Sequence, residues 1–207
     1  MIASWPTRCA NMPNDNVAKT DADLLHDLAE GTDAALSILI DRYKDPLFRF
    51  ILRYTGATAD AEDILQDTFV SIYTKASTYD PAWKASTWMY RIALNKCRDQ
   101  ARKKKIRRLV SLDQFGRGAD GEPSLPIDIP DPGASPEEIT AQRQALANLS
   151  RAIDTLPHKL RTALVLSSIE NRPQAECAEI LGVSRKSVEM LVYRARNALR
   201  EKLDLTD

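Results

Sequence analysis

The stretch 60–108 most limits what this chain can fold into, because it holds two amphipathic helical segments of opposite charge joined by an aromatic-rich loop. Apolar residues of the first segment recur at three- and four-residue spacing and so share one helix face: Ile64, Leu65, Phe69, Ile72 and Tyr73. The other face is acidic. It is either a solvated surface or a docking surface for a basic partner, with Asp60, Asp63, Gln66 and Asp67 as the candidate docking residues.

The second segment is predicted to begin near Ser86 or Thr87, and it ends in a nearly unbroken basic run. Aromatic residues cluster at and before its start: Tyr79, Trp83, Trp88 and Tyr90. Aromatic rings can stack on unpaired bases, and a run of like charges repels itself unless something neutralises it. The pattern therefore favours a nucleic-acid surface. The alternative is a helix with Trp88 and Tyr90 in the core and a solvated basic end.

Helical periodicity continues on the N-terminal side of this stretch. Leu24 lies in a short predicted helix for which Asp21 or Asp23 is the expected N-cap. Pro46 is expected to kink or restart the next helix, and Gly56 to close it. No run of alternating β-branched residues occurs, so the predicted fold class is all-α.

The C-terminal part has the pattern of a helix-turn-helix. Pro136 and Pro157 bracket one predicted helix, Gly182 supplies a turn, and Ser184 caps the last helix. The face of that last helix opposite its apolar stripe is mostly basic, and its candidate DNA-binding residues are Arg185, Lys186, Glu189, Met190, Tyr193, Arg194 and Arg196. A helical hairpin with a solvated basic face is the alternative interpretation.

These patterns predict two small helical domains joined by a flexible linker. The linker is rich in Gly, Pro and acidic residues and has little to bury. The predicted divisions are a flexible tail at 1–20, an N-terminal domain at 21–108, the linker at 109–136 and a C-terminal domain at 137–207.

Composition argues against several classes of protein. The 29 basic and 29 acidic residues give a net charge of zero, but the charges are segregated along the chain, which suits separate DNA and protein surfaces. The three cysteines and two histidines have no metal-binding spacing, and no Gly-rich phosphate loop occurs, so we expect neither an enzyme nor a cofactor. No apolar run approaches the roughly 20 residues of a membrane span. A reducing, cytoplasmic setting is expected.

The segments DAEDILQDTF and STWMYRIALNKCRDQARKKK resemble region 2 of an extracytoplasmic-function (ECF) RNA polymerase sigma factor, and the helix-turn-helix resembles region 4 of the same family. The resemblance implies a bacterial protein that binds core RNA polymerase at the beta-prime clamp and beta flap. It further implies binding to promoter DNA, and an anti-sigma factor as regulator. The implied minus-10 residues are Tyr79, Trp83, Lys84, Trp88, Arg91, Asn95, Lys96, Arg98 and Arg102. The resemblance also implies that the candidate docking residues bind core polymerase. It implies that the last helix binds the minus-35 element.

The chain departs from the family pattern at three places. Ala85 stands where an aromatic residue often precedes the Ser/Arg-Thr-Trp triplet, and Glu189-Met190 stands where many members have Arg-Ser. Residues 171–173, Asn-Arg-Pro, replace the usual Gly-x-Ser. Cys97 lies in the basic segment, so modification of its thiol could modulate DNA binding. A helix-turn-helix regulator acting without polymerase and a sigma-mimic interaction module are the alternative functions.

Overall fold

The computed structural model describes residues 19–111 and 136–203, and within these ranges every regular element is helical and no strand occurs. This confirms the all-α class. The α-helices are α1 (Asp21–Ala29), α2 (Ala34–Thr55), α3 (Thr58–Lys75), α4 (Ala85–Ser111), α5 (Pro136–Asp154), α6 (His158–Leu164), α7 (Gln174–Leu181) and α8 (Arg185–Lys202). A 3₁₀ turn, η1 (Ala76–Thr78), follows α3, and a π-helical turn, η2 (Val165–Ile169), follows α6. Residues 1–18 of the predicted tail and 112–135 of the predicted linker lie outside the described residues, whereas Lys19 and Thr20 are described and lead into α1.

Local hydrogen bonds set the first helix boundaries differently from the sequence-based expectation. Thr20 is the N-cap of α1: its hydroxyl accepts a hydrogen bond from Asp23 N at 3.2 Å, and the Asp23 carboxylate accepts one from Thr20 N at 3.0 Å. The prediction of Asp21 or Asp23 as the N-cap is wrong, because Asp23 occupies the third helical position of this capping box. The expected restart at Pro46 is also wrong, since α2 continues through it as one helix.

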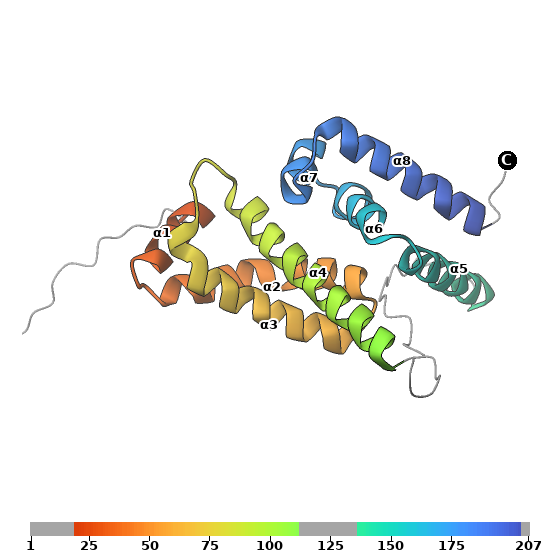
Figure 1. The fold of residues 1–207 in the computed structure, drawn as a ribbon, viewed down its shortest axis with the longest axis horizontal. Coiled ribbons are helices and arrows are strands. Elements are labelled where there is room, and N and C mark those ends of the chain that lie inside the picture. The colour runs from red at the N-terminus through yellow and green to blue at the C-terminus, as the bar shows by residue number, and fades with distance from the viewer. Residues whose placement is uncertain (1–18, 112–135, 204–207) are drawn as a thin grey trace, which may run out of the picture.

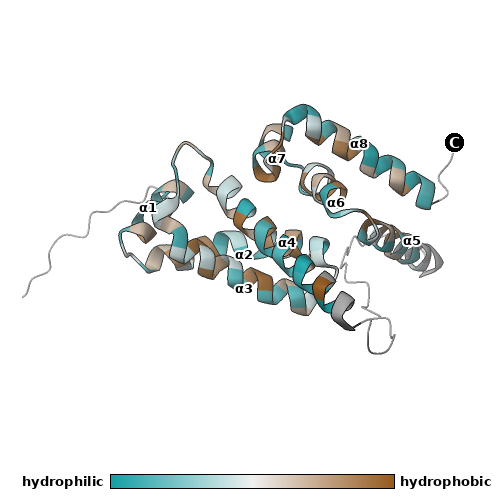
Figure 2. Ribbon diagram, in the orientation of Figure 1, coloured by the Kyte–Doolittle hydropathy of each residue, from teal (hydrophilic) through white to brown (hydrophobic). Residues whose placement is uncertain are grey.

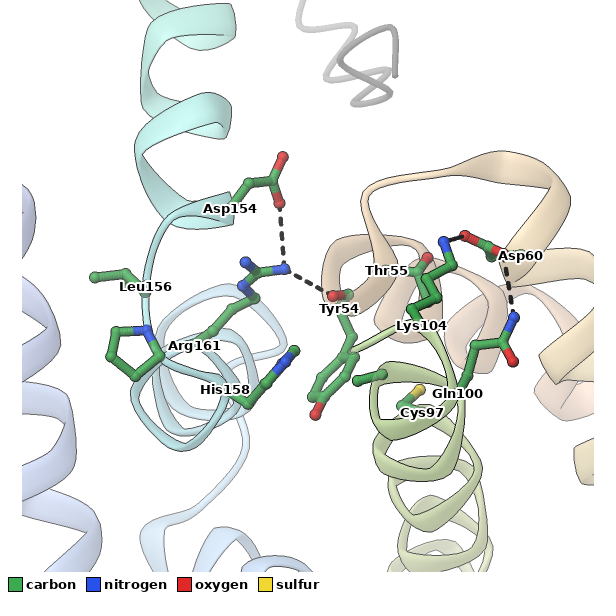
Figure 3. Close-up of a pocket in the computed structure, with 12 residues that line it drawn as sticks. Tyr54, Thr55, Asp60, Cys97, Gln100, Lys104, Asp154, Leu156, His158 and Arg161 are labelled. Atoms are coloured by element: carbon green, nitrogen blue, oxygen red, sulfur yellow. Dashed lines mark hydrogen bonds and ion pairs between the residues drawn. The ribbon is translucent and has the colours of Figure 1, made fainter. Parts of the chain in front are cut away.

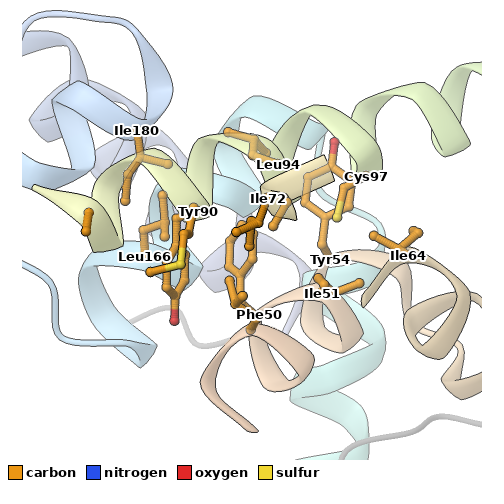
Figure 4. Packing of buried hydrophobic residues seen from close by; sticks show 14 of the residues in the cluster. Phe50, Ile51, Tyr54, Ile64, Ile72, Tyr90, Leu94, Cys97, Leu166 and Ile180 are labelled. Atoms are coloured by element: carbon orange, nitrogen blue, oxygen red, sulfur yellow. The ribbon is translucent and has the colours of Figure 1, made fainter. Parts of the chain in front are cut away.

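Helices α1–α4 form an N-terminal group around a shared apolar core (Figure 1). Leu24, Phe50, Ile72 and Tyr90 are completely buried, and the Phe50 and Tyr90 rings lie 5.2 Å apart between centroids. Figure 4 shows these two side chains next to one another beneath α4, and their ring planes are inclined by 53°. Burial of each large apolar side chain contributes about 1.5–3 kcal/mol, so this core is the main reason that α4 is held against α2 and α3.

Helices α5–α8 form a C-terminal group that contains the predicted helix-turn-helix. Gly182 ends α7 with a φ of +70°, a conformation that side chains with a Cβ rarely adopt. The Ser184 hydroxyl then accepts a hydrogen bond from Ser187 N and caps α8. The buried side of α8 includes Val188 and Ala195. The turn and the cap are as predicted.

The two groups of helices pack directly against one another. Helix α7 contacts α4, and η2 and α6 contact α2 (Figure 1). The apolar cluster of the N-terminal group continues without interruption into Leu166 and Ile180 of the C-terminal group (Figure 4). Hydrophilic residues follow the outer sides of both groups (Figure 2). The structure thus brings the two predicted functional regions into contact, an arrangement that the sequence patterns did not predict.

Candidate nucleic-acid interface

Helix α8 presents an open polar face on the outside of the C-terminal group. Every residue predicted to bind the minus-35 element is exposed: Arg185, Lys186, Glu189, Met190, Tyr193, Arg194 and Arg196. Met190 and Tyr193 retain 47% and 62% of their accessible surface, although both have large apolar parts. Because the cap at Ser184 fixes the start of the helix, the first turns of α8 present a contiguous surface of mixed cations, one carboxylate and one phenol.

An aromatic cluster precedes and begins α4. The rings of Tyr79 and Trp88 meet edge to face at 5.5 Å, and the Tyr79 hydroxyl donates a hydrogen bond to the Trp83 carbonyl at 2.7 Å. The Arg91 guanidinium lies 5.5 Å from the centre of the Trp83 ring. Trp83 is 41% exposed. A solvent-facing indole beside a guanidinium offers both a stacking surface for a base and a charge for a phosphate.

A polar stripe extends from this cluster along α4. Five of the predicted minus-10 residues recur every three or four positions and therefore lie along one side of the helix: Trp88, Arg91, Asn95, Arg98 and Arg102. All are exposed or partly exposed, and Arg98 donates a hydrogen bond to the Asn95 amide oxygen at 3.5 Å. Lys84 is exposed in the preceding turn, and Lys96 is partly buried and lies off this stripe.

Tyr90 differs from the other predicted aromatics. It is fully buried against Phe50, so it belongs to the core and not to the exposed aromatic cluster. Its position, two residues beyond Trp88, turns it to another side of the helix.

The structure separates the predicted acidic docking set on α3 into two parts. Asp63, Gln66 and Asp67 are exposed and share a helix face. The Asp60 carboxylate instead accepts a hydrogen bond from Gln100 at 3.3 Å and pairs with Lys104, both of which belong to α4. Asp60 therefore joins α3 to the basic end of α4.

Exposed apolar side chains continue the acidic face of α3. Val70 is 56% exposed and Tyr73 is 47% exposed. Helical spacing predicts that Tyr73 shares the apolar face of Ile64 and Ile72, but those two side chains are buried whereas Tyr73 is exposed, and its hydroxyl donates a hydrogen bond to Asp33 at 3.1 Å. Val70 was missed, although it follows Gln66 by four positions and Asp67 by three, a spacing that indicates the same face.

Cys97 does not lie on the polar stripe of α4. It is 1% exposed and packs in the core, where burial raises the pKa of its thiol to about 12. A thiol with such a pKa is almost wholly protonated at neutral pH and reacts slowly. The structure therefore contradicts the interpretation of Cys97 as an accessible redox site.

Two further features bear on the site. Among the described residues, no group of three or more His, Cys, Asp or Glu side chains could hold a metal ion. Across residues 19–111 and 136–203, no helix combines the length and apolarity required to cross a membrane.

Comparison with known protein families matches both helical groups. Residues 39–107 match the model of sigma-70 region 2, and residues 146–199 match that of sigma-70 region 4. The first match covers the acidic helix, the aromatic cluster and most of α4. The second covers most of the C-terminal group, including the helix-turn-helix.

Two curated relatives are similar over nearly their whole length. The ECF RNA polymerase sigma factor SigW of Bacillus subtilis is 33% identical over 174 residues, which cover 84% of this chain and 91% of the relative. The RNA polymerase sigma factor CnrH of Cupriavidus metallidurans is 31% identical over 189 residues, covering 91% and 97%.

Solved structures share the fold. A structure of CnrH in complex with the cytosolic domain of CnrY matches with a TM-score of 0.63 and 28% identity, over 91% of this chain and all of that one. The sigma factor RpoE in complex with the anti-sigma factor NepR from Bartonella quintana matches with a TM-score of 0.62 over 83% and 98%. The identity in the second case is 21%, so that likeness shows the fold alone.

Proposed function

The chain belongs to the extracytoplasmic-function family of RNA polymerase sigma factors, and we propose which of its surfaces perform the steps of transcription initiation. The observation that carries the proposal is the presence in one chain of an exposed helix-turn-helix face and a separate aromatic and cationic face on α4. A protein that only bound duplex DNA would need the first but not the second. The proposed division is region 2 at 21–108, the linker at 109–136 and region 4 at 137–207.

The acidic face of α3 is the proposed docking surface for the beta-prime clamp of core RNA polymerase. Asp63, Gln66 and Asp67 supply charge and hydrogen-bonding groups, and Val70 and Tyr73 add apolar area beside them. Charge steers the encounter, whereas buried apolar surface contributes most of the affinity. Asp60 is excluded from this surface because it is already paired with Lys104. Region 4 is proposed to contact the beta flap.

The aromatic cluster and the polar stripe of α4 are the proposed minus-10 surface. Strand separation requires a base to leave the stack, which costs a few kcal/mol. Stacking on an aromatic ring returns about 1–3 kcal/mol per base, and Trp83 is the exposed ring that is best placed for it. Arg91 beside that ring, and Arg98 and Arg102 farther along, would hold the phosphates of the separated strand.

Helix α8 is the proposed minus-35 reader. Glu189 is exposed in its second turn, where a carboxylate can accept a hydrogen bond from the amino group of cytosine. An arginine at this position would instead select guanine. The promoters of this sigma factor are therefore expected to carry a cytosine at the base that faces Glu189.

The cellular setting is part of the same proposal. A sigma factor acts where polymerase and DNA are, which indicates the bacterial cytoplasm. The related sigma factor CnrH has been solved in complex with the cytosolic domain of CnrY, and we propose that a protein partner of the anti-sigma class likewise controls this chain. Release from that partner would allow the chain to initiate transcription of a stress regulon.

Run-off transcription tests these assignments directly. Core RNA polymerase would be supplied with a library of promoter fragments, with and without the full chain. We expect specific initiation that requires the protein, and initiation should fall at least about tenfold with the double variant Asp63→Lys/Asp67→Lys, because two reversed charges would face a basic partner. The matched control is Glu30→Lys/Asp41→Lys, which reverses two exposed carboxylates outside α3.

Three outcomes would contradict the proposal. Equal loss in the test and control variants would remove the docking role of α3. Tight duplex binding without polymerase-dependent initiation would indicate a simple helix-turn-helix regulator. Absence of both duplex binding and polymerase-dependent initiation would indicate an interaction module that mimics a sigma factor.

A further inference from the structure

Three arginines join the two groups of helices, and we call Arg53, Arg161 and Arg172 the arginine clasp. Arg161 is 6% exposed. Its guanidinium donates a hydrogen bond to the Tyr54 carbonyl at 2.8 Å and lies 3.4 Å from the Asp154 carboxylate (Figure 3). Tyr54 belongs to the last turn of α2, whose carbonyls have no partner within the helix. An arginine of the C-terminal group thus caps a helix of the N-terminal group.

The residues around Arg161 allow the end of α2 to lie close to the C-terminal group. Gly56 ends α2 with a φ of +72°, and a Cβ at that position would lie 3.4 Å from the Asp154 carboxylate oxygens. The His158 ring stacks on the Tyr54 ring, with centroids 5.2 Å apart and planes inclined by 16°. A cavity of about 440 Å³ separates the remaining facing side chains, which include Asp60 and Lys104 (Figure 3).

Arg172 forms the second contact of the clasp. Its guanidinium lies 3.6 Å from the centre of the Tyr90 ring, which is the buried aromatic of α4, and it pairs with Glu176. The Glu176 carboxylate also accepts a hydrogen bond from the Ser86 hydroxyl at 3.3 Å. Arg172 belongs to the Asn-Arg-Pro segment, residues 171–173, which leads into α7.

Arg53 of α2 forms the third contact of the clasp. It pairs with Glu170, and the two side chains are only 19% and 10% exposed. Between the clasp contacts, α7 covers the beginning of α4, where Met89 is completely buried. The interface therefore combines apolar burial with ion pairs that are mostly shielded from water. Loss of either partner from such a pair leaves an uncompensated buried charge.

This packing sets the two DNA-binding surfaces side by side. Trp83 and Arg91 of the aromatic cluster line the same cavity of about 710 Å³ as Ser184 and Arg185 at the start of α8. By their names, the minus-35 and minus-10 elements are centred about 25 base pairs apart, or roughly 85 Å at about 3.4 Å per base pair. Surfaces that line one cavity cannot reach both elements at once.

We propose that the arginine clasp holds this sigma factor in a closed state, and that the two groups of helices must separate before both promoter elements can be bound. The functional consequence rests on the promoter roles proposed above, whereas the closed state itself rests only on the contacts of the clasp. Because binding to core polymerase at promoter spacing would require the open state, closure reduces the apparent affinity by the fraction of open molecules. The clasp is thus an autoinhibitory contact within one chain.

A charge-swap experiment on the full chain tests the clasp. Small-angle X-ray scattering would compare the radius of gyration of the parent with Arg53→Glu, Glu170→Arg and the double variant that carries both. We expect each single variant to expand, because like charges then face one another in the interface, and the swapped pair to restore the compact value. Arg151→Glu is the matched control, since Arg151 is exposed and donates hydrogen bonds to Ala147 and Asn148 of its own helix α5.

Affinity for core polymerase gives a second readout. Each single variant should bind core at least about tenfold more tightly than the parent, and the swapped pair should return to the parental value. Circular dichroism would establish that helical content is retained, and Arg172→Ala provides an independent opening variant that reverses no charge. Unchanged radii in all three single variants, or an expansion that the swap fails to reverse, would overturn the closed state. Expansion without any core binding would retain the clasp and refute the sigma-factor assignments instead.

Discussion

At the scale of the residue, burial decides chemistry that neighbouring charges alone would not predict. Cys97 has a basic residue on each side in the sequence, and cations usually favour the thiolate. The structure shows the opposite effect, because loss of water outweighs the nearby charge and raises the thiol pKa. The position itself was predictable: Cys97 follows the core residues Tyr90 and Leu94 at helical spacing.

The thiol of Cys97 should therefore be almost inert in the folded protein. Its pKa of about 12, against an ordinary value of 9.0, lowers the thiolate fraction at pH 8 on the order of 10³-fold. Iodoacetamide labelling followed by peptide mass spectrometry would measure the rate in native protein and in urea. Similar rates in the two conditions would contradict the burial of this residue. Cys177, whose pKa is raised to about 11, should also be protected, though less strongly.

At the scale of the element, helix ends were predictable where both the turn residue and the capping residue could be identified from the sequence. Gly182 and Ser184 gave the correct end of α7 and start of α8, because a left-handed turn and an N-cap depend only on residues within four positions. The same reasoning failed at α1, where the predicted caps were Asp21 and Asp23 and the observed cap is Thr20. The capping box selected Thr20 because its partner Asp23 lies three positions later.

Removal of the α8 cap should destabilise region 4 specifically. Ser184→Ala leaves the Ser187 amide without its acceptor and should lower the free energy of unfolding by about 1 kcal/mol. Urea unfolding monitored by circular dichroism would measure this change. Ser37→Ala, in the exposed interior of α2, should have no such cost, because alanine is the better helix former there. Equal effects in the two variants would show that the Ser184 hydroxyl does not stabilise the helix.

At the scale of the whole molecule, the two helical groups are held together by contacts that respond to charge. His158 stacks on Tyr54 beside Arg161, and burial, with a smaller contribution from the Arg161 charge, lowers its pKa. Across the cavity lie Asp60 and Lys104, and Asp154 flanks Arg161. Burial raises the pKa of Asp154, while Arg161 opposes that change.

The closed state should weaken as the pH falls below about 6.5. His158 binds a proton more readily in the open state, where its pKa returns toward 6.5. Closure is therefore fully retained above that value and is lost progressively as the pH falls toward the lower pKa of the closed state. Asp154 acts in the opposite direction, but near its own ordinary value of 3.8 and somewhat above it. Scattering measured between pH 7.5 and 5.5 should show expansion in the parent, and much less in His158→Gln. An equal expansion in that variant would assign the effect to another group.

The helices, the helix-turn-helix and the faces that carry each charge could be predicted from the sequence, since periodicity and most caps arise from residues within four positions of one another. Which charges remain available to a partner, and how the two groups of helices meet, depends instead on contacts between residues far apart in the chain. Asp60 finds Gln100 at a separation of 40 residues, Arg161 finds Tyr54 at 107, and Arg53 finds Glu170 at 117. Such contacts follow from packing of whole helices, and no local pattern along the chain encodes them.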